Sequence, residues 1–178
     1  MSNMTTLLIS EDYIKSNSGL DDNVYGKFLY PAIKEAQEMG LQTIIGSSLY
    51  ETILGMVDNS TISDVEMADY KNLLDKYIQP YLLYKTIVTL IPIVGTKIAN
   101  IGTVITNDEH IANITKNERD LLVDYYQFRA DFYCNQLQDY LCHNRSKYPE
   151  LRDCDCARIK ANLTSSATCP IWLGGRRQ

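Results

Sequence analysis

The chain has 178 residues, of which 45% are hydrophobic and 22% are charged, and its formal net charge is −5. This length fits one domain, or one domain with tails, and the composition is ordinary for a soluble globular protein. The acidic balance argues against a protein whose main task is to hold nucleic-acid phosphates. The first residues contain neither a basic region nor a long apolar region, so we expect no signal peptide.

Two helices are predicted in the N-terminal quarter of the chain. The first begins at Ser10, an N-cap residue type followed by two acidic residues, and ends near Gly19. The second begins soon afterwards and ends at Gly46, a residue type suited to a C-terminal cap. Because proline disturbs a helix, Pro31 is expected to kink or divide the second helix.

Three capping boxes, in which Ser or Thr stands three residues before Glu, predict further helix starts. The pairs are Ser48 with Glu51, Ser63 with Glu66, and Thr115 with Glu118. They predict helices near residues 49–57, 64–79 and 116–146. The fold class that follows is all-α, with a compact helical bundle.

A further, strongly apolar helix is predicted from Tyr81 to Ile91, between Pro80 and Pro92. A membrane span needs about 20 apolar residues, and this segment is shorter and contains Lys85. A helix this apolar must be enclosed by protein on most sides. We therefore expect it at the centre of the bundle and not in a membrane.

The segment at about residues 95–114 is rich in Gly, Asn, Thr and β-branched residues, which predicts an extended arm. Ile98, Ile101 and Val104 are its regularly placed apolar residues, and the arm is too short to bury them alone. Backbone pairing with a neighbouring subunit would satisfy the N–H and C=O groups of the arm. These three residues are therefore predicted to contact a partner.

The long helix predicted at 116–146 carries two apolar stripes, about 110° apart at 100° per residue. The first stripe contains Leu121, Tyr125, Phe128 and Phe132, and the second contains Leu122, Tyr126, Tyr133, Leu137 and Tyr140. Residues expected on the solvated side are Asp120, Asp124, Gln127, Asp131 and Gln138. One stripe could face the core and the other a neighbouring subunit, or both could be buried within one fold.

The chain divides into a predicted body, residues 1–151, and an extended C-terminal tail, residues 152–178. The tail has five basic and two acidic residues, a net charge of +3, which leaves 12 basic and 20 acidic residues, −8, in the body. Trp172 and Leu173 are predicted apolar anchors for a partner. Arg176 and Arg177 are predicted to pair with the acidic body of an adjacent subunit.

Thirteen tyrosines are many beside three phenylalanines and one tryptophan. Tyrosine combines an apolar ring with a polar tip, so it is common both at the edge of a core and in protein interfaces. Both interpretations remain open from the sequence.

No catalytic or metal-binding motif is recognised in the sequence. His110 and His143 have no convincing nucleophile partner, and the P-loop, GxSxG, GxGxxG and HExxH motifs are absent. Cys142, which precedes His143, and the pair Cys154 and Cys156 are ligand types, but zinc sites usually separate paired ligands by two residues. The five cysteines are expected to be free thiols in a reducing compartment. We expect no enzymatic activity, no metal and no cofactor.

Three stretches carry a resemblance to a known family: LISEDYIKSNSGLDDNV, IQPYLLYKTIVTLIPIVGTKIANIGTV and YLCHNRSKYPEL. In their residues and their order they resemble the small, mostly helical head-to-tail connector (adaptor) proteins of tailed phages, particularly those of Bacteroides and crAss-like phages. The resemblance covers most of the chain to about Leu151.

The resemblance implies a structural virion protein that forms a ring, typically of twelve copies, beneath the portal. Such a ring extends the DNA channel, lets DNA pass without sequence-specific binding, and docks the next neck or tail component. The implied location is the neck of the virion, and the host cytoplasm during assembly. The alternative from the basic tail is a small helical DNA-binding or packaging accessory protein.

Overall fold

The computed structural model describes residues 6–20, 26–94, 96–99, 102–105 and 115–151. The described residues form helices and one small hairpin, which confirms the all-α prediction for the body. The α-helices are α1 (Glu11–Asn17), α2 (Gly26–Glu35), α3 (Gln42–Ile45), α4 (Ser47–Asp58), α5 (Ala68–Leu73), α6 (Gln79–Val94) and α7 (Lys116–His143). Two π-helical turns, η1 (Ala36–Leu41) and η4 (Leu74–Ile78), and three 3-10 turns, η2 (Thr61–Ser63), η3 (Val65–Met67) and η5 (Arg145–Lys147), join them.

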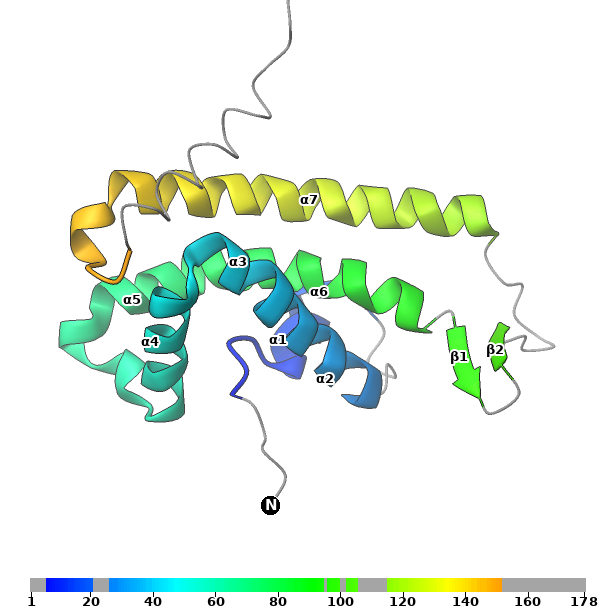
Figure 1. Ribbon diagram of the computed structural model, residues 1–178, viewed down its shortest axis with the longest axis horizontal. Helices are drawn as coiled ribbons and strands as arrows, with labels where there is room; N and C mark the ends of the chain where they lie inside the picture. Colours follow the sequence, from blue (N-terminus) through cyan, green and yellow to red (C-terminus); the bar gives the residue numbers. More distant parts are fainter. Residues whose placement is uncertain (1–5, 21–25, 95, 100–101, 106–114, 152–178) are drawn as a thin grey trace, which may run out of the picture.

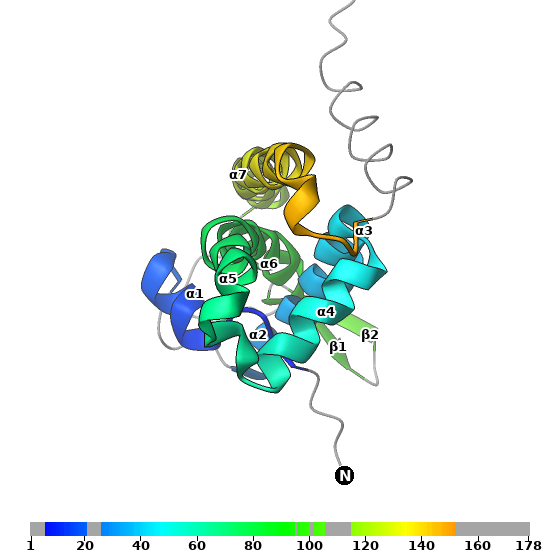
Figure 2. The same ribbon diagram turned by 90° about the vertical axis from the view of Figure 1, so that its left-hand side faces the viewer.

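The helical stretch formed by α5, η4 and α6 lies in the middle of the molecule. Figure 2 shows α6 with α7 on one side and α1, α2 and α4 around the others. The buried side chains of α6 are Tyr81, Leu82, Leu83, Thr86, Ile87 and Leu90. Because they face several elements at once, the apolar character of this segment follows from packing.

Neither proline bounds the central helix, which corrects the predicted limits of Tyr81 to Ile91. α6 begins at Gln79, continues through Pro92 to Val94, and follows η4 without a break. Proline lacks an N–H and its ring crowds the carbonyl four residues earlier, so an α-helix must loosen there. The wider π turn directly before Pro80 loosens the backbone at this point. Pro31 likewise lies within α2 and does not divide it.

The longer helix also changes the argument about membranes. The stretch Val65–Val94 has 30 residues and is apolar enough, by length and composition alone, to cross a bilayer. The expectation that this segment is too short for a span therefore rested on wrong helix limits. The core helix of a soluble protein passes the same test, and Leu82 and Ile87 are 0% and 1% exposed within the bundle.

Two of the predicted helix caps are confirmed and two are wrong. Ser10 accepts a hydrogen bond from the Tyr13 amide at the start of α1, and Thr115 forms a complete capping box. α4 begins instead after Gly46, whose φ of 80° ends α3 and whose carbonyl accepts from the Tyr50 amide. Because this sharp reversal already starts the helix, the box at Ser48 is not used. The box at Ser63 is also unused, because residues 61–67 form two 3-10 turns.

A buried glutamine ties the N-terminal segment to the bundle. Gln37, in η1, accepts from the Leu8 amide at 2.7 Å through Oε1, and its Nε2 donates to the Thr6 carbonyl at 3.3 Å. Gly40 in the same turn packs so close to α6 that an added Cβ would lie 2.7 Å from the Tyr81 hydroxyl oxygen. Leu8 and Ile9 can therefore join the core although they lie outside any helix.

Within the predicted arm, the described residues 96–99 and 102–105 are extended and pair with each other. β1 (Thr96–Ala99) and β2 (Gly102–Ile105) form an antiparallel hairpin that extends from the end of α6 (Figure 1). In its register Ile98 lies opposite Thr103, and Val104 lies opposite Lys97. Within these strands the backbone pairing expected from a neighbouring subunit is thus made inside the chain, and each strand keeps one outer edge.

Candidate interaction surface

The capping box of α7 fixes where this 28-residue helix begins. The Glu118 amide donates to Thr115 Oγ1 at 3.3 Å, and the Thr115 amide donates to Glu118 Oε2 at 2.8 Å. The hydrogen bonds from the Thr115 backbone and hydroxyl lower the pKa of the exposed Glu118 carboxyl. Because the two bonds are reciprocal, they set the rotation of the first turn and so the face that each later residue occupies.

Tyrosines spaced by seven residues join α7 to the central helix. On one side they are Tyr70, Tyr77 and Tyr84, and on the other Tyr126, Tyr133 and Tyr140. Tyr77 stacks on Tyr140 with ring centroids 4.1 Å apart, and Tyr84 stacks on Tyr133 at 5.3 Å. We call these six residues the tyrosine seam. It shows that much of the tyrosine excess serves packing within one chain.

Tyrosine hydroxyl groups form hydrogen bonds at the C-terminal end of the contact between α7 and the central helical stretch. The Tyr70 hydroxyl donates to Glu150 at 2.8 Å, and the Tyr148 hydroxyl donates to the Asp69 carbonyl at 3.0 Å. Lys147 forms an ion pair with Asp69 at 2.7 Å. Burial, followed by the bond to Glu150, raises the pKa of Tyr70 to about 12. This end of α7 is therefore held by satisfied polar groups as well as by rings.

The other apolar stripe of α7 is exposed. Leu121, Tyr125, Phe128 and Phe132 are 68%, 51%, 76% and 52% exposed, and we call these four residues the exposed stripe. Their spacing of four, three and four residues places them within about 60° of one another on the helix. Most of the second stripe packs inward, with Leu137 fully buried, whereas its first residue, Leu122, is 40% exposed. The alternative that both stripes are buried in one fold is therefore wrong. Gln138, which was expected on the solvated side, is buried as well.

The exposed stripe has an acidic flank and a basic flank. Asp120, Asp124 and Asp131 are exposed, and at 100° per residue they lie about 60–100° to one side of Leu121. Neither Asp120 nor Asp124 forms an ion pair with any residue that the structure describes. On the other flank the Arg129 guanidinium lies 4.1 Å from the Tyr125 ring centre and 5.8 Å from that of Tyr84.

Two hydrogen bonds connect the acidic flank to the central helix. Lys85 Nζ donates to Gln127 Oε1 at 3.4 Å, and Gln127 Nε2 donates to Asp131 Oδ1 at 2.6 Å. Asp131 is thus oriented by its own helix, while its carboxylate can still accept a further donor. An apolar stripe with carboxylates along one edge is suited to a partner that combines apolar and basic side chains.

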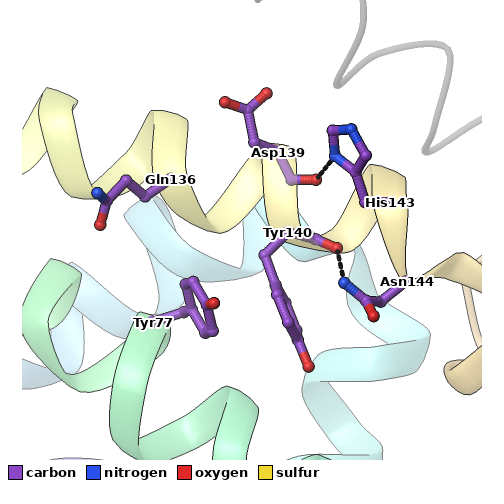
Figure 3. A pocket seen from close by; sticks show the side chains of 6 residues that line it. All are labelled: Tyr77, Gln136, Asp139, Tyr140, His143 and Asn144. Atoms are coloured by element: carbon purple, nitrogen blue, oxygen red, sulfur yellow. Dashed lines mark hydrogen bonds between the residues drawn. The ribbon is translucent and has the colours of Figure 1, made fainter.

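A shallow recess of about 400 Å³ lies at the other end of α7, lined by Tyr77, Gln136, Asp139, Tyr140, His143 and Asn144 (Figure 3). His143 Nδ1 lies 2.7 Å from the Asp139 carbonyl oxygen, and Asn144 donates to the Tyr140 carbonyl at 3.0 Å. These polar groups serve their own helix. None of the lining residues is Ser, Thr, Cys or Lys, so the recess lacks the hydroxyl, thiol and amine nucleophiles that an imidazole usually activates.

The cysteines of the described residues give no metal centre. Within the described ranges no group of three or more His, Cys, Asp and Glu side chains could hold an ion. His143 lines the recess and Cys142 does not, whereas Cys154 and Cys156 lie outside the described residues. Burial raises the pKa of the Cys134 thiol to about 11, so this thiol stays protonated near neutral pH. The absence of enzymatic activity and of a cofactor remains a prediction.

The predicted contact residues are placed only in part. Ile98 lies in β1 and Val104 in β2, in the two inner pairs of the register. Ile101 and the tail residues lie outside the described residues; the tail residues are Trp172, Leu173, Arg176 and Arg177. The exposed stripe was recognised as a stripe but was not among the predicted contact residues.

Comparison with known proteins gives one match. Residues 41–161 match the model of a family of unknown function, DUF6712. The chain belongs to the DUF6712 family. No curated protein and no solved structure matches it significantly. The DUF6712 region runs from the end of η1 through α7, so it includes the tyrosine seam and the exposed stripe, whereas Trp172 lies beyond it.

Proposed function

We propose that this protein is a structural, non-enzymatic subunit of a ring-forming head-to-tail connector in the neck of a tailed-phage virion. The ring, of twelve copies by the resemblance, would lie beneath the portal protein, extend the DNA channel and dock the next neck or tail component. The subunits would assemble in the host cytoplasm.

The exposed stripe is the observation that carries this proposal. Phe128 has no polar tip and is 76% exposed, so the isolated fold gives no reason for a phenylalanine at this position. A subunit that closes into a ring needs a surface for each of its two neighbours. The stripe offers one such surface, and the outer edges of the hairpin offer another place for backbone pairing.

The charge of the body supports the same role. The body carries a net charge of −8, and an acidic wall would repel DNA phosphates. A conduit through which DNA must slide gains from weak binding, whereas a protein that holds DNA needs a basic surface. The basic residues of the tail could then contact other subunits.

The test is the oligomeric state of the full-length protein and of a stripe variant. Native mass spectrometry and negative-stain images across a concentration series should show closed rings for the wild type. A variant with Phe128→Ser and Phe132→Ser should stay folded by circular dichroism and lose the rings. Wild-type protein that remains monomeric at every concentration, and is missing from the neck of particles labelled with an antibody against it, contradicts the proposal.

The basic tail favours one second candidate, a DNA-binding or packaging accessory protein. That function requires affinity for duplex DNA that falls steeply with salt, because bound counterions are released. Fluorescence anisotropy with a labelled duplex at several salt concentrations measures it. Tight, salt-sensitive binding by monomers would favour the accessory function over the connector.

A further inference from the structure

The tail and the exposed stripe have complementary compositions. Its last residues include the adjacent apolar pair Trp172 and Leu173, followed within four positions by Arg176 and Arg177. The stripe is apolar and aromatic, and Asp120, Asp124 and Asp131 are exposed along one flank of it. Apolar anchors beside arginines thus meet an apolar surface beside carboxylates, with complementary charge signs.

The stripe is also the right size for a short peptide. Phe128 and Phe132 lie one helical turn apart, about 6 Å along the axis, and the whole stripe spans about 16 Å. That length accommodates roughly five residues of extended chain. Trp172 to Arg176 are five residues. A buried tryptophan on a phenylalanine surface is the type of contact that dominates small interfaces.

The last described residue and the exposed stripe lie at different ends of α7. The described chain ends at Leu151, beside the C-terminal end of α7 (Figure 1), whereas the exposed stripe lies within the first 17 of the 28 residues of that helix. From His143 to the middle of the stripe is about 26 Å along the helix axis. Closed rings form when one surface of a subunit binds a different surface of the next, and tail and stripe are two such surfaces.

We propose that the C-terminal segment, residues 170–177, of one copy docks on the exposed stripe of a neighbouring copy. Trp172 and Leu173 cover Phe128 and Phe132, and Arg176 and Arg177 pair with the carboxylates of the acidic flank. This inference rests on the proposed function, because it names the contact between adjacent subunits of the ring.

The chain contains a single tryptophan, so its fluorescence reports on the tail alone. Docking should shift the emission of Trp172 to shorter wavelength as protein concentration rises. Full-length protein with Phe128→Ser and Phe132→Ser should keep the emission of a solvated indole at all concentrations. A matched control with Met39→Ser and Val65→Ser, which removes apolar residues 72% and 93% exposed elsewhere, should behave as the wild type.

The concentration series decides whose tail is bound. A short-wavelength emission that persists at concentrations where native mass spectrometry shows only monomers means that the tail binds its own chain, and it overturns the assignment to a neighbour. An emission that stays at long wavelength at every concentration overturns the docking altogether.

Mixing two full-length variants tests the contact directly. One variant carries the stripe changes Phe128→Ser and Phe132→Ser, and the other carries Trp172→Ala and Leu173→Ala, so only the first has tryptophan emission. Adding the second should shift the emission of the first to shorter wavelength. Asp124→Arg and Asp131→Arg in the second variant should abolish the shift, and Arg176→Asp with Arg177→Asp in the first should restore it. A shift that is absent, or insensitive to these charge reversals, counts against the proposed pairing.

The outcomes also separate this inference from the connector function. Closed rings formed by the Trp172→Ala and Leu173→Ala variant would refute tail docking and leave the connector proposal standing. A concentration-dependent tryptophan shift without closed rings in native mass spectrometry would support tail docking and refute the ring.

Discussion

The two halves of α7 are built from similar residues and have opposite surroundings. In the C-terminal half, Leu137 and Leu141 are fully buried, and tyrosine rings stack on the central helix with bonded hydroxyls. Nearer the N-terminus of the helix, Phe128 and Phe132 have no hydroxyl and are 76% and 52% exposed. Aromatic content alone therefore does not show which face of a helix is core. The presence or absence of a polar tip is the more useful indicator, since a tip lets a ring lie at the edge of a fold.

The largest difference in stability should come from placing the same charge at a buried position and at an exposed position of the stripe. Ile87→Asp puts a carboxylate at a position 1% exposed, and we expect it to cost about 4 kcal/mol or more, enough to prevent folding. Leu121→Asp, at 68% exposure, should change the free energy of unfolding by no more than about 0.5 kcal/mol. Urea unfolding followed by circular dichroism measures both. Equal losses from the two variants would mean that the stripe is part of the core.

A second pair of variants compares the two stripes within α7. Leu137→Ala removes a fully buried side chain and should cost about 2–5 kcal/mol. Phe128→Ala should be nearly neutral for the monomer, because its ring already faces water. The measurement is thermal unfolding at a concentration low enough to keep the protein monomeric. A cost above about 2 kcal/mol for Phe128→Ala would show that the monomer needs this ring.

High pH should destabilise the contact that tyrosines make at the C-terminal end of α7. The folded pKa of Tyr70 is raised from 10.0 to about 12, and burial also raises the pKa of Tyr148. Because the folded pKa lies above the unfolded one, the stabilisation is complete below about pH 10 and is lost as pH rises through about 12. The free energy of unfolding should therefore fall across this window.

Tyr70→Phe is the matched variant for the alkaline transition. It should cost about 1 kcal/mol at neutral pH through the lost bond to Glu150. It should also make the loss of stability between pH 10 and 12 shallower than in the wild type. An unchanged alkaline profile would assign that loss to other tyrosines.

The smallest effect concerns a buried hydroxyl group of α6 that has no hydrogen-bond partner among the described residues. Thr86 is fully buried, and its hydroxyl has no hydrogen-bond partner among the described residues. Thr86→Val keeps the shape and removes a polar group that folding takes out of water, so stability should rise by about 1 kcal/mol. Denaturant unfolding measures the change. A loss of stability would show that the hydroxyl is satisfied in solution.

The sequence predicted the helical class better than the helix limits. The caps at Ser10 and Thr115 were found because a side chain and an amide meet within a few residues. The limits at Pro80 and Pro92 were wrong, because a π turn and a helix end accommodate proline in ways that depend on tertiary packing. The helix start expected at Ser48 was also wrong, because the positive φ of Gly46 reverses the chain directly before α4.

The candidate surface could be predicted only to the level of alternatives. Angular position showed two stripes on α7, but which of them is buried depends on how the helix packs against α6. The seven-residue spacing of Tyr70, Tyr77 and Tyr84, matched by Tyr126, Tyr133 and Tyr140, was the signal that could have decided it. A repeated ring on two helices indicates that those faces meet, and it leaves the phenylalanine face exposed.

The π turn η4 has a consequence for how the length of this chain can vary in evolution. Its hydrogen bonds close over five residues where an α-helix closes over four, so it holds one residue more than the turn it replaces. Deleting one residue between Leu74 and Ile78 would convert it to an α-helical turn and leave both flanking helices facing the same way. A deletion in the middle of α6 would instead rotate all later residues by about 100° and misplace the tyrosine seam. Among DUF6712 proteins, single-residue gaps within this helix are therefore expected at η4.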